Sequence, residues 1–139
     1  MEALADGYGG SLDGPGALAE RMGIVLTEAA PERVVGVMPV EGNTQPYGLL
    51  HGGASCVLAE TLGSIASALH GMTVDRPLAV GVDINATHHK AVRTGTVVGV
   101  ATPLHRGRGT ATYEIAISDD RGDRVCTARL TCLLRAAPG

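Results

Sequence analysis

The hydrophobic residues of this 139-residue chain change their spacing along its length. In the first third, ALAERMG (17–23) predicts a short helix, and the apolar runs on either side of residues 30–32 predict two strands. EGNTQPYG (41–48) has the composition of a loop. Residues 1–16, rich in glycine and polar side chains, and residues 136–139 are expected to be poorly ordered tails.

The apolar residues then recur at helical spacing, which predicts one long helix over residues 52–70 that ends near Gly71. On a helical wheel that starts from Glu60, the opposite side carries the large apolar residues Leu58, Leu62, Ile65 and Leu69. The side around Glu60 carries only small residues, namely Gly53, Cys56, Ser64 and Ser67. No other Asp, Glu, Lys or Arg occurs between Glu41 and Asp75.

After this helix the spacing changes to two, which is typical of strands. Residues 79–89 alternate, and we expect one face to point inward with Val80, Val82, Ile84, Ala86 and His88. Further strands are predicted in residues 95–104, 109–118 and 124–135, the last with Cys126, Ala128, Leu130, Cys132 and Leu134 on one face. DDRGD (119–123) predicts a hairpin turn.

Strands that follow one another on short connections form an antiparallel sheet. Such a sheet packed on one helix belongs to the α+β class, and the length of the chain fits a single domain over residues 17–135. The core must be built from aliphatic side chains, because the chain has three Tyr and no Phe or Trp.

Composition argues against several classes of function. The net charge is -3 and no block of Lys and Arg occurs, so we predict neither a nucleic-acid nor a membrane partner. No apolar run is expected to span a bilayer, and the first residues lack the basic and apolar regions of a secretory signal. A cytoplasmic location is therefore expected.

Metal, disulfide and cofactor chemistry are not indicated either. Cys56, Cys126 and Cys132 form no CxxC pair, and we expect them to be small core residues. The five histidines lack metal-ligand spacing; His88 is predicted to point inward and His89 to be exposed. The chain has no nucleophile elbow, GxGxxG motif or phosphate loop, so no metal or cofactor is predicted.

The pattern alone leaves two interpretations of Glu60 open. It is either an exposed surface residue, as most helical glutamates are, or a carboxylate in an interface or ligand groove that acts as a general base. HGG (51–53) is likewise either a glycine-based helix cap or a set of free N–H donors able to hold an oxyanion.

Three segments together resemble a known family: NTQPYGLLHGGASCVLAETLGS (43–64), NATHHKAV (85–92) and PLHRGRGTATYEIAISDDRGDRVCTARL (103–130). They are similar to the hotdog-fold acyl-CoA thioesterases of the PaaI-like, 4-hydroxybenzoyl-CoA thioesterase branch. Within that branch the similarity is greatest to the enterobactin-associated proofreading thioesterases and the menaquinone-pathway thioesterases.

This resemblance implies an antiparallel sheet wrapped around a central helix, a homotetramer built as a dimer of dimers, and active sites at the dimer interface. It implies hydrolysis of acyl-CoA, with an aryl or hydroxyaryl acyl group, to a free acid and CoA. Coenzyme A would enter only as part of the substrate.

The resemblance also implies a role for each matching residue. Glu60 would be the general base or the nucleophile, and the Gly52 N–H would donate to the thioester carbonyl. The positions that would complete the site are Gln45, His51, Ser64 and His88. Lys90, Arg93, Arg106 and Arg108, by pattern solubilising charges, become candidates for binding the CoA phosphates.

Three alternatives remain open. The substrate could be an acyl-carrier-protein thioester, or the chain could be a non-catalytic module that binds acyl-CoA. A hotdog dehydratase is disfavoured, because those enzymes resemble a different pattern with His-Phe-Pro-Gly and a longer spacing than that between His51 and Glu60.

Overall fold

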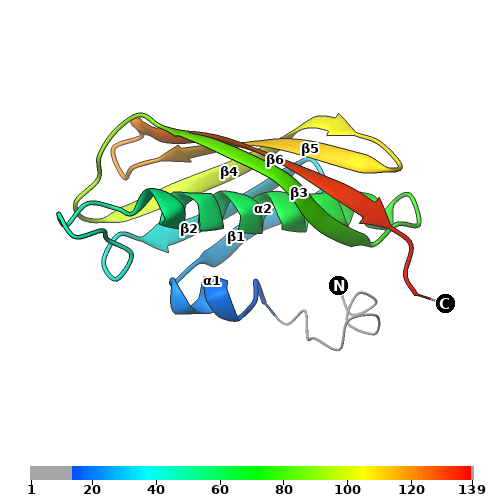
Figure 1. Ribbon diagram of the computed structural model, residues 1–139, viewed down its shortest axis with the longest axis horizontal. Helices are drawn as coiled ribbons and strands as arrows, with labels where there is room; N and C mark the ends of the chain where they lie inside the picture. The colour runs from blue at the N-terminus through cyan, green and yellow to red at the C-terminus, as the bar shows by residue number, and fades with distance from the viewer. Residues whose placement is uncertain (1–13, 139) are drawn as a thin grey trace.

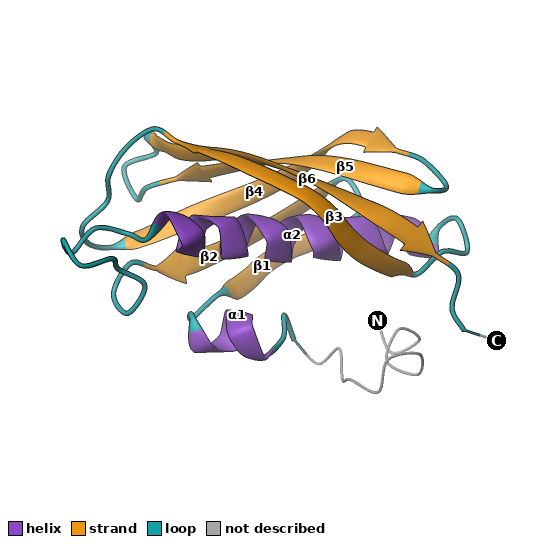
Figure 2. Ribbon diagram, viewed as in Figure 1, coloured by secondary structure: helices purple, strands orange, loops and turns teal. Residues whose placement is uncertain are grey.

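A six-stranded antiparallel sheet curves around one long helix in the computed structural model, which describes residues 14–138 (Figure 1). The helices are α1 (Ala17–Arg21) and α2 (Gly52–Met72), and the strands are β1 (Val25–Ala30), β2 (Arg33–Pro39), β3 (Leu78–His88), β4 (Thr96–Arg106), β5 (Thr110–Ser118) and β6 (Arg124–Arg135). Figure 2 shows the sheet as one layer and α2 as the other, with α1 beyond the β1 edge. The predicted α+β class is confirmed.

The predicted elements are found close to their expected positions, but two pairings differ from the order of the chain, β2 with β4 and β3 with β6. The sheet order is β1-β2-β4-β5-β6-β3, so β3 pairs with β6 and forms an edge, although β4 follows it in sequence. The connection from β3 to β4 therefore crosses from one edge to the middle of the sheet. The expected tail over residues 1–16 lies mostly outside the described residues.

No apolar run long enough to span a bilayer is expected from the sequence, and α2 contradicts this expectation. By length and composition alone, α2 could cross a membrane. The core helix of a soluble protein passes the same test, and α2 contacts all six strands of the sheet. Its hydrophobicity is accounted for by these contacts.

Two glycines on adjacent strands allow α2 to approach the sheet closely. Gly36 of β2 and Gly99 of β4 are register partners, and Leu62 of α2 lies over both. A Cβ on Gly36 would be 2.7 Å from Leu62 Cδ2, and a Cβ on Gly99 would be 2.6 Å from Leu62 Cδ1. Leu62 is fully buried, as the helical wheel predicted, and Glu60 is exposed.

A β-bulge in β3 changes which of its residues face α2. The register shifts between Gly81 and Asp83, so Val82 has no partner on β6. Beyond the bulge Ile84, Ala86 and His88 pair with core-facing residues of β6, as predicted. Before it the alternation is reversed, so the prediction that Val80 and Val82 point inward is wrong; they are 45% and 54% exposed.

An ion-pair cluster holds the end of β3 near the β5–β6 turn. Lys90 Nζ donates to Asp119 Oδ2 at 2.6 Å and to Asp123 Oδ2 at 2.7 Å. Asp119 also accepts bonds from the backbone N–H groups of Arg121 and Asp123. The hydrogen bond from Lys90 is the main cause that holds the pKa of Asp119 below its ordinary value, and it raises the pKa of Lys90.

We expect Gly99→Ala to destabilise the protein by about 1–3 kcal/mol, because a Cβ there would be 2.6 Å from Leu62 Cδ1 and 3.2 Å from Leu58 Cδ2, and both fully buried leucines would have to shift. Gly109→Ala is the control, since a Cβ added there would have no atom within 4 Å, and it should change the free energy of unfolding by less than about 0.5 kcal/mol. Urea unfolding measures both. Adding Leu62→Val should partly relieve the Gly99→Ala contact, and strictly additive effects would contradict this account.

The lowered pKa of Asp119 predicts a pH-dependent contribution to stability. This contribution is present above the ordinary carboxyl pKa of about 3.9 and is lost as the pH falls through the pKa in the folded protein. Asp119→Asn should therefore unfold at lower urea than the unaltered protein at pH 7, and the difference should shrink below about pH 4. Asp120→Asn in the same turn is the control. A difference that stays constant down to pH 3 would contradict this assignment.

Candidate active site

The N-terminus of α2 carries the first part of the candidate site. His51 is the N-cap residue, and its Nδ1 accepts a hydrogen bond from the Gly53 N–H at 2.8 Å. The cap is thus a histidine side chain, and the glycine-based cap is wrong. Within residues 14–138, the Gly52 N–H has no hydrogen-bond partner, so it is a free donor at the positive end of a 21-residue helix.

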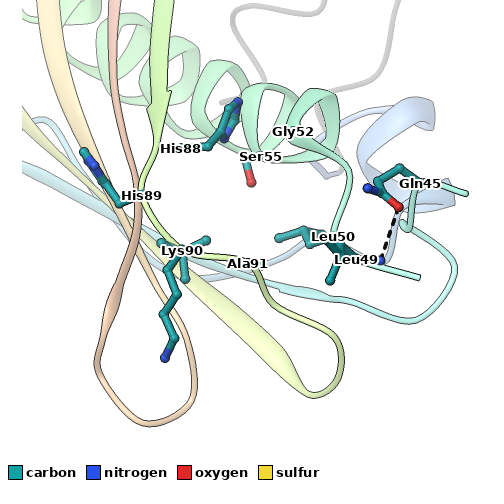
Figure 3. A pocket seen from close by; sticks show the side chains of 10 residues that line it. Gln45, Leu49, Leu50, Gly52, Ser55, His88, His89, Lys90 and Ala91 are labelled. Carbon is teal, nitrogen blue, oxygen red and sulfur yellow. Dashed lines mark hydrogen bonds between the residues drawn. The ribbon is translucent and has the colours of Figure 1, made fainter. Parts of the chain in front are cut away.

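A hollow of about 330 Å³ opens at this end of α2 (Figure 3). Its lining includes Gln45, Gly52, Ser55 and His88. Gln45 Oε1 accepts bonds from the backbone of its own loop, from Tyr47 at 2.5 Å and from Leu49 at 3.4 Å. The loop thereby fixes the amide group of Gln45.

The His88 ring lies directly over Gly52. A Cβ on Gly52 would be 2.8 Å from His88 Nε2, so only glycine leaves room for the imidazole there. The β3 bulge gives His88 its inward orientation, since His88 pairs with the buried Cys126 of β6. The predicted orientation of His88 is confirmed, although its side chain stays accessible from the hollow.

Glu60 borders a second, more apolar hollow of about 260 Å³. Its other lining residues are Leu18, Cys56, Val57, Thr61 and Ile84. Glu60 lies over Gly81 of β3, where a Cβ would be 2.9 Å from Glu60 Oε1. Cys56 is half-buried in this lining, so the prediction that it is a core residue is wrong.

The two hollows lie apart in one chain. Gly52 and Glu60 are eight residues apart on α2, which corresponds to about 12 Å along the helix axis. Gln45, Gly52 and His88 are brought together at the first hollow, with His51 capping the helix beside them. Glu60 lies at the second hollow, and the half-buried Ser64 follows one turn later.

The four basic candidates are divided between the two ends of α2. Lys90 is engaged with two carboxylates, and Arg93 is exposed in the β3–β4 connection. Arg108 Nη1 donates to the Val74 carbonyl at 3.4 Å, just beyond the C-terminus of α2. Arg106, on the same hairpin, lies 3.9 Å from Glu32. One chain therefore does not gather these four cations around a single phosphate.

The remaining cysteines and histidines have structural surroundings. Cys126 and Cys132 are fully buried as predicted; burial raises the pKa of the Cys126 thiol to about 11 and also raises that of Cys132. His70 is buried and donates from Nε2 to the Gly107 carbonyl at 2.6 Å. His89 is exposed as predicted. No group of three or more His, Cys, Asp or Glu suited to a metal ion occurs among the described residues.

The sequence reasoning overlooked Ser55. It lies one turn after Gly52, is 1% exposed and lines the first hollow. The helical spacing of three from Gly52 was a signal that places both residues on one face.

Comparison with known proteins identifies the family. The Thioesterase superfamily model matches residues 47–126. The proofreading thioesterase EntH of Cronobacter sakazakii is 50% identical over 117 residues, 84% of either chain.

Solved structures agree in fold. A glutamine-to-alanine variant of a Pseudomonas aeruginosa thioesterase is 41% identical, with a TM-score of 0.79 and 86% of both chains covered. A Haemophilus influenzae thioesterase is 32% identical, with a TM-score of 0.78 over 97% of this chain and 87% of the other. The expected hotdog fold is confirmed, and the chain belongs to the thioesterase superfamily as an enzyme that hydrolyses thioesters.

Proposed function

We propose that this thioesterase hydrolyses acyl-CoA, with an aryl or hydroxyaryl acyl group, in a site shared by two subunits. The observation that carries the proposal is the division of the candidate residues between two hollows of one chain. The apolar lining around Glu60 favours an uncharged acyl group. An acyl-carrier-protein thioester is the alternative substrate with the same reacting bond.

The proposed reaction begins with polarisation of the thioester carbonyl. The Gly52 N–H donates to the carbonyl oxygen, and the helix dipole of α2 favours the negative charge that develops there. Gln45, His51 and His88 surround this position and hold the thioester and the water, and Ser64 lies one turn beyond the acid.

Glu60 then supplies the base. As it removes a proton from water, the water oxygen bonds to the carbonyl carbon, and the carbon–sulfur bond breaks. The thiolate leaves and takes the proton, which yields a free acid and CoA. In the nucleophilic variant, the Glu60 carboxylate attacks first and water hydrolyses the resulting anhydride. Neither route uses a metal or a cofactor.

A second copy of the chain would complete the site. β3 is an edge strand with exposed Val80 and Val82, and a long apolar edge is suited to pairing with another chain. Pairing there in a two-fold arrangement would carry Glu60 of one copy towards the α2 N-terminus of the other. The tetrameric state and the binding of CoA phosphates by Arg106, Arg108, Lys90 or Arg93 stay predictions.

We expect Glu60→Gln to lower kcat about a hundredfold or more, because the amide can act neither as a base nor as a nucleophile. Thiol release should be measured on a panel of aryl- and fatty-acyl thioesters of both CoA and acyl-carrier protein. Glu41→Gln, which neutralises an exposed loop carboxylate, should keep the full rate. Hydrolysis by Glu60→Gln at the unaltered rate would exclude Glu60 as the catalyst.

The shared site predicts complementation between two inactive variants. Gln45→Ala damages the first hollow and Glu60→Gln the second, so refolding both together should restore about a quarter of the activity, since half of the dimers are mixed and each mixed dimer has one intact site. The same variants refolded separately are the control. No recovery in a sample that contains mixed dimers would place each site within one chain.

A further inference from the structure

The proposed reaction assigns no role to the side chain of Ser55. The residue is 1% exposed, and in Figure 3 its hydroxyl points from α2 into the first hollow, between His88 and Leu50. No hydrogen bond of this hydroxyl to another described residue is found, and the hydroxyl borders the hollow instead of being sealed in the core. It forms no bond to the carbonyl one turn earlier, unlike the hydroxyl of Thr61 on the same helix, which donates to the Val57 carbonyl at 2.7 Å.

Small-molecule sites orient their ligands with a few polar groups, and a hydroxyl that lines a hollow without a protein partner is available for that role. The surroundings of Ser55 also supply a second free donor, the Gly52 N–H. The two residues are three apart on α2, so both donors face the same hollow.

The position of the two donors limits what they can bind. Both groups can donate, which suits an acceptor oxygen that gains negative charge. The N-terminal end of a helix favours such an oxygen further. His88 lies over the bare Cα of Gly52, so an acceptor held by the two donors would lie beside the imidazole.

We propose that the Ser55 hydroxyl is a second oxyanion donor, which acts with the Gly52 N–H on the carbonyl oxygen of the thioester. This inference rests on the proposed function. Ser55 keeps its proton throughout and forms no covalent bond; it shortens its hydrogen bond as the carbonyl oxygen becomes an oxyanion. The stabilisation is thus larger in the transition state than with bound substrate, and it affects kcat more than KM.

Ser55→Ala tests this role because catalysis should respond strongly and stability only weakly. Loss of one oxyanion donor should lower kcat about a hundredfold with little change in KM. Removal of a hydroxyl that bonds to no other protein group should change Tm little. A serine that served only the packing of α2 would lower Tm when replaced and would leave kcat nearly intact.

Ser67→Ala is the matched control. Ser67 lies twelve residues later on the same helix, is fully buried, and its hydroxyl also lacks a partner among the described residues. It lines neither hollow. Its replacement should therefore leave kcat and KM unchanged, which separates the loss of any serine hydroxyl from α2 from the loss of the hydroxyl at the hollow.

The assay should use the best thioester from the substrate panel, with the unaltered enzyme and Glu60→Gln measured alongside. If Glu60→Gln is impaired and Ser55→Ala turns over normally, the inference is overturned while the proposed function stands. A rise in KM with kcat unchanged would also overturn it, because Ser55 would then bind the ground state only. Absence of hydrolysis by the unaltered protein on every thioester would overturn the proposed function, and the inference with it.

Discussion

The structure depends on the contact of Leu62 with the glycine pair formed by Gly36 and Gly99. A helix can approach a sheet this closely only where side chains are missing on the strands, and here two adjacent strands lack them at one register position. The two methyl groups of Leu62 lie over the two glycines, one on each strand. This contact sets the rotation of α2 about its axis, and with it the direction in which every other residue of the helix points. Glu60, on the other side of the helix, is thereby turned towards β3 and away from the centre of the sheet.

Glycines also leave the space in which the polar side chains of the site lie. The His88 ring lies over the Cα of Gly52, and the Glu60 carboxylate lies over that of Gly81. In both places a Cβ would come within 3 Å of the polar group. The site is therefore built from pairs, each with one reactive side chain and one glycine that leaves room for it. The β3 bulge connects the two pairs, because it places Gly81 and His88 on the same face although they are seven residues apart.

The polar groups around the first hollow differ in whether their hydrogen bonds contribute to the stability of the folded chain. The Lys90 cluster secures the segment after His88 with charge-assisted hydrogen bonds and contributes to folding. The Gly52 N–H and the Ser55 hydroxyl bond to no other described group, so they contribute no such hydrogen bond to the folded chain. Lys90, Gly52 and Ser55 all line the first hollow, and the donors at Gly52 and Ser55 have no hydrogen-bond partner among the described residues. Such an arrangement is suited to an anionic oxygen that exists only during a reaction.

The sequence by itself determined the fold class, the long helix, the core-facing side of β6 and the segment that carries the candidate residues, because these follow from local spacing and from motifs of neighbouring residues. It did not determine the bulge at Val82, because a bulge depends on the register with β6 and leaves the alternation of residue types unchanged. The pairing of β3 with β6, the histidine cap and the unpartnered Ser55 hydroxyl likewise depend on residues distant in the chain or on the orientation of one side chain. The separation of about 12 Å between Glu60 and Gly52 already follows from the predicted helix, whereas only the tertiary structure placed Glu60 in a hollow with Leu18 and with Ile84 of β3.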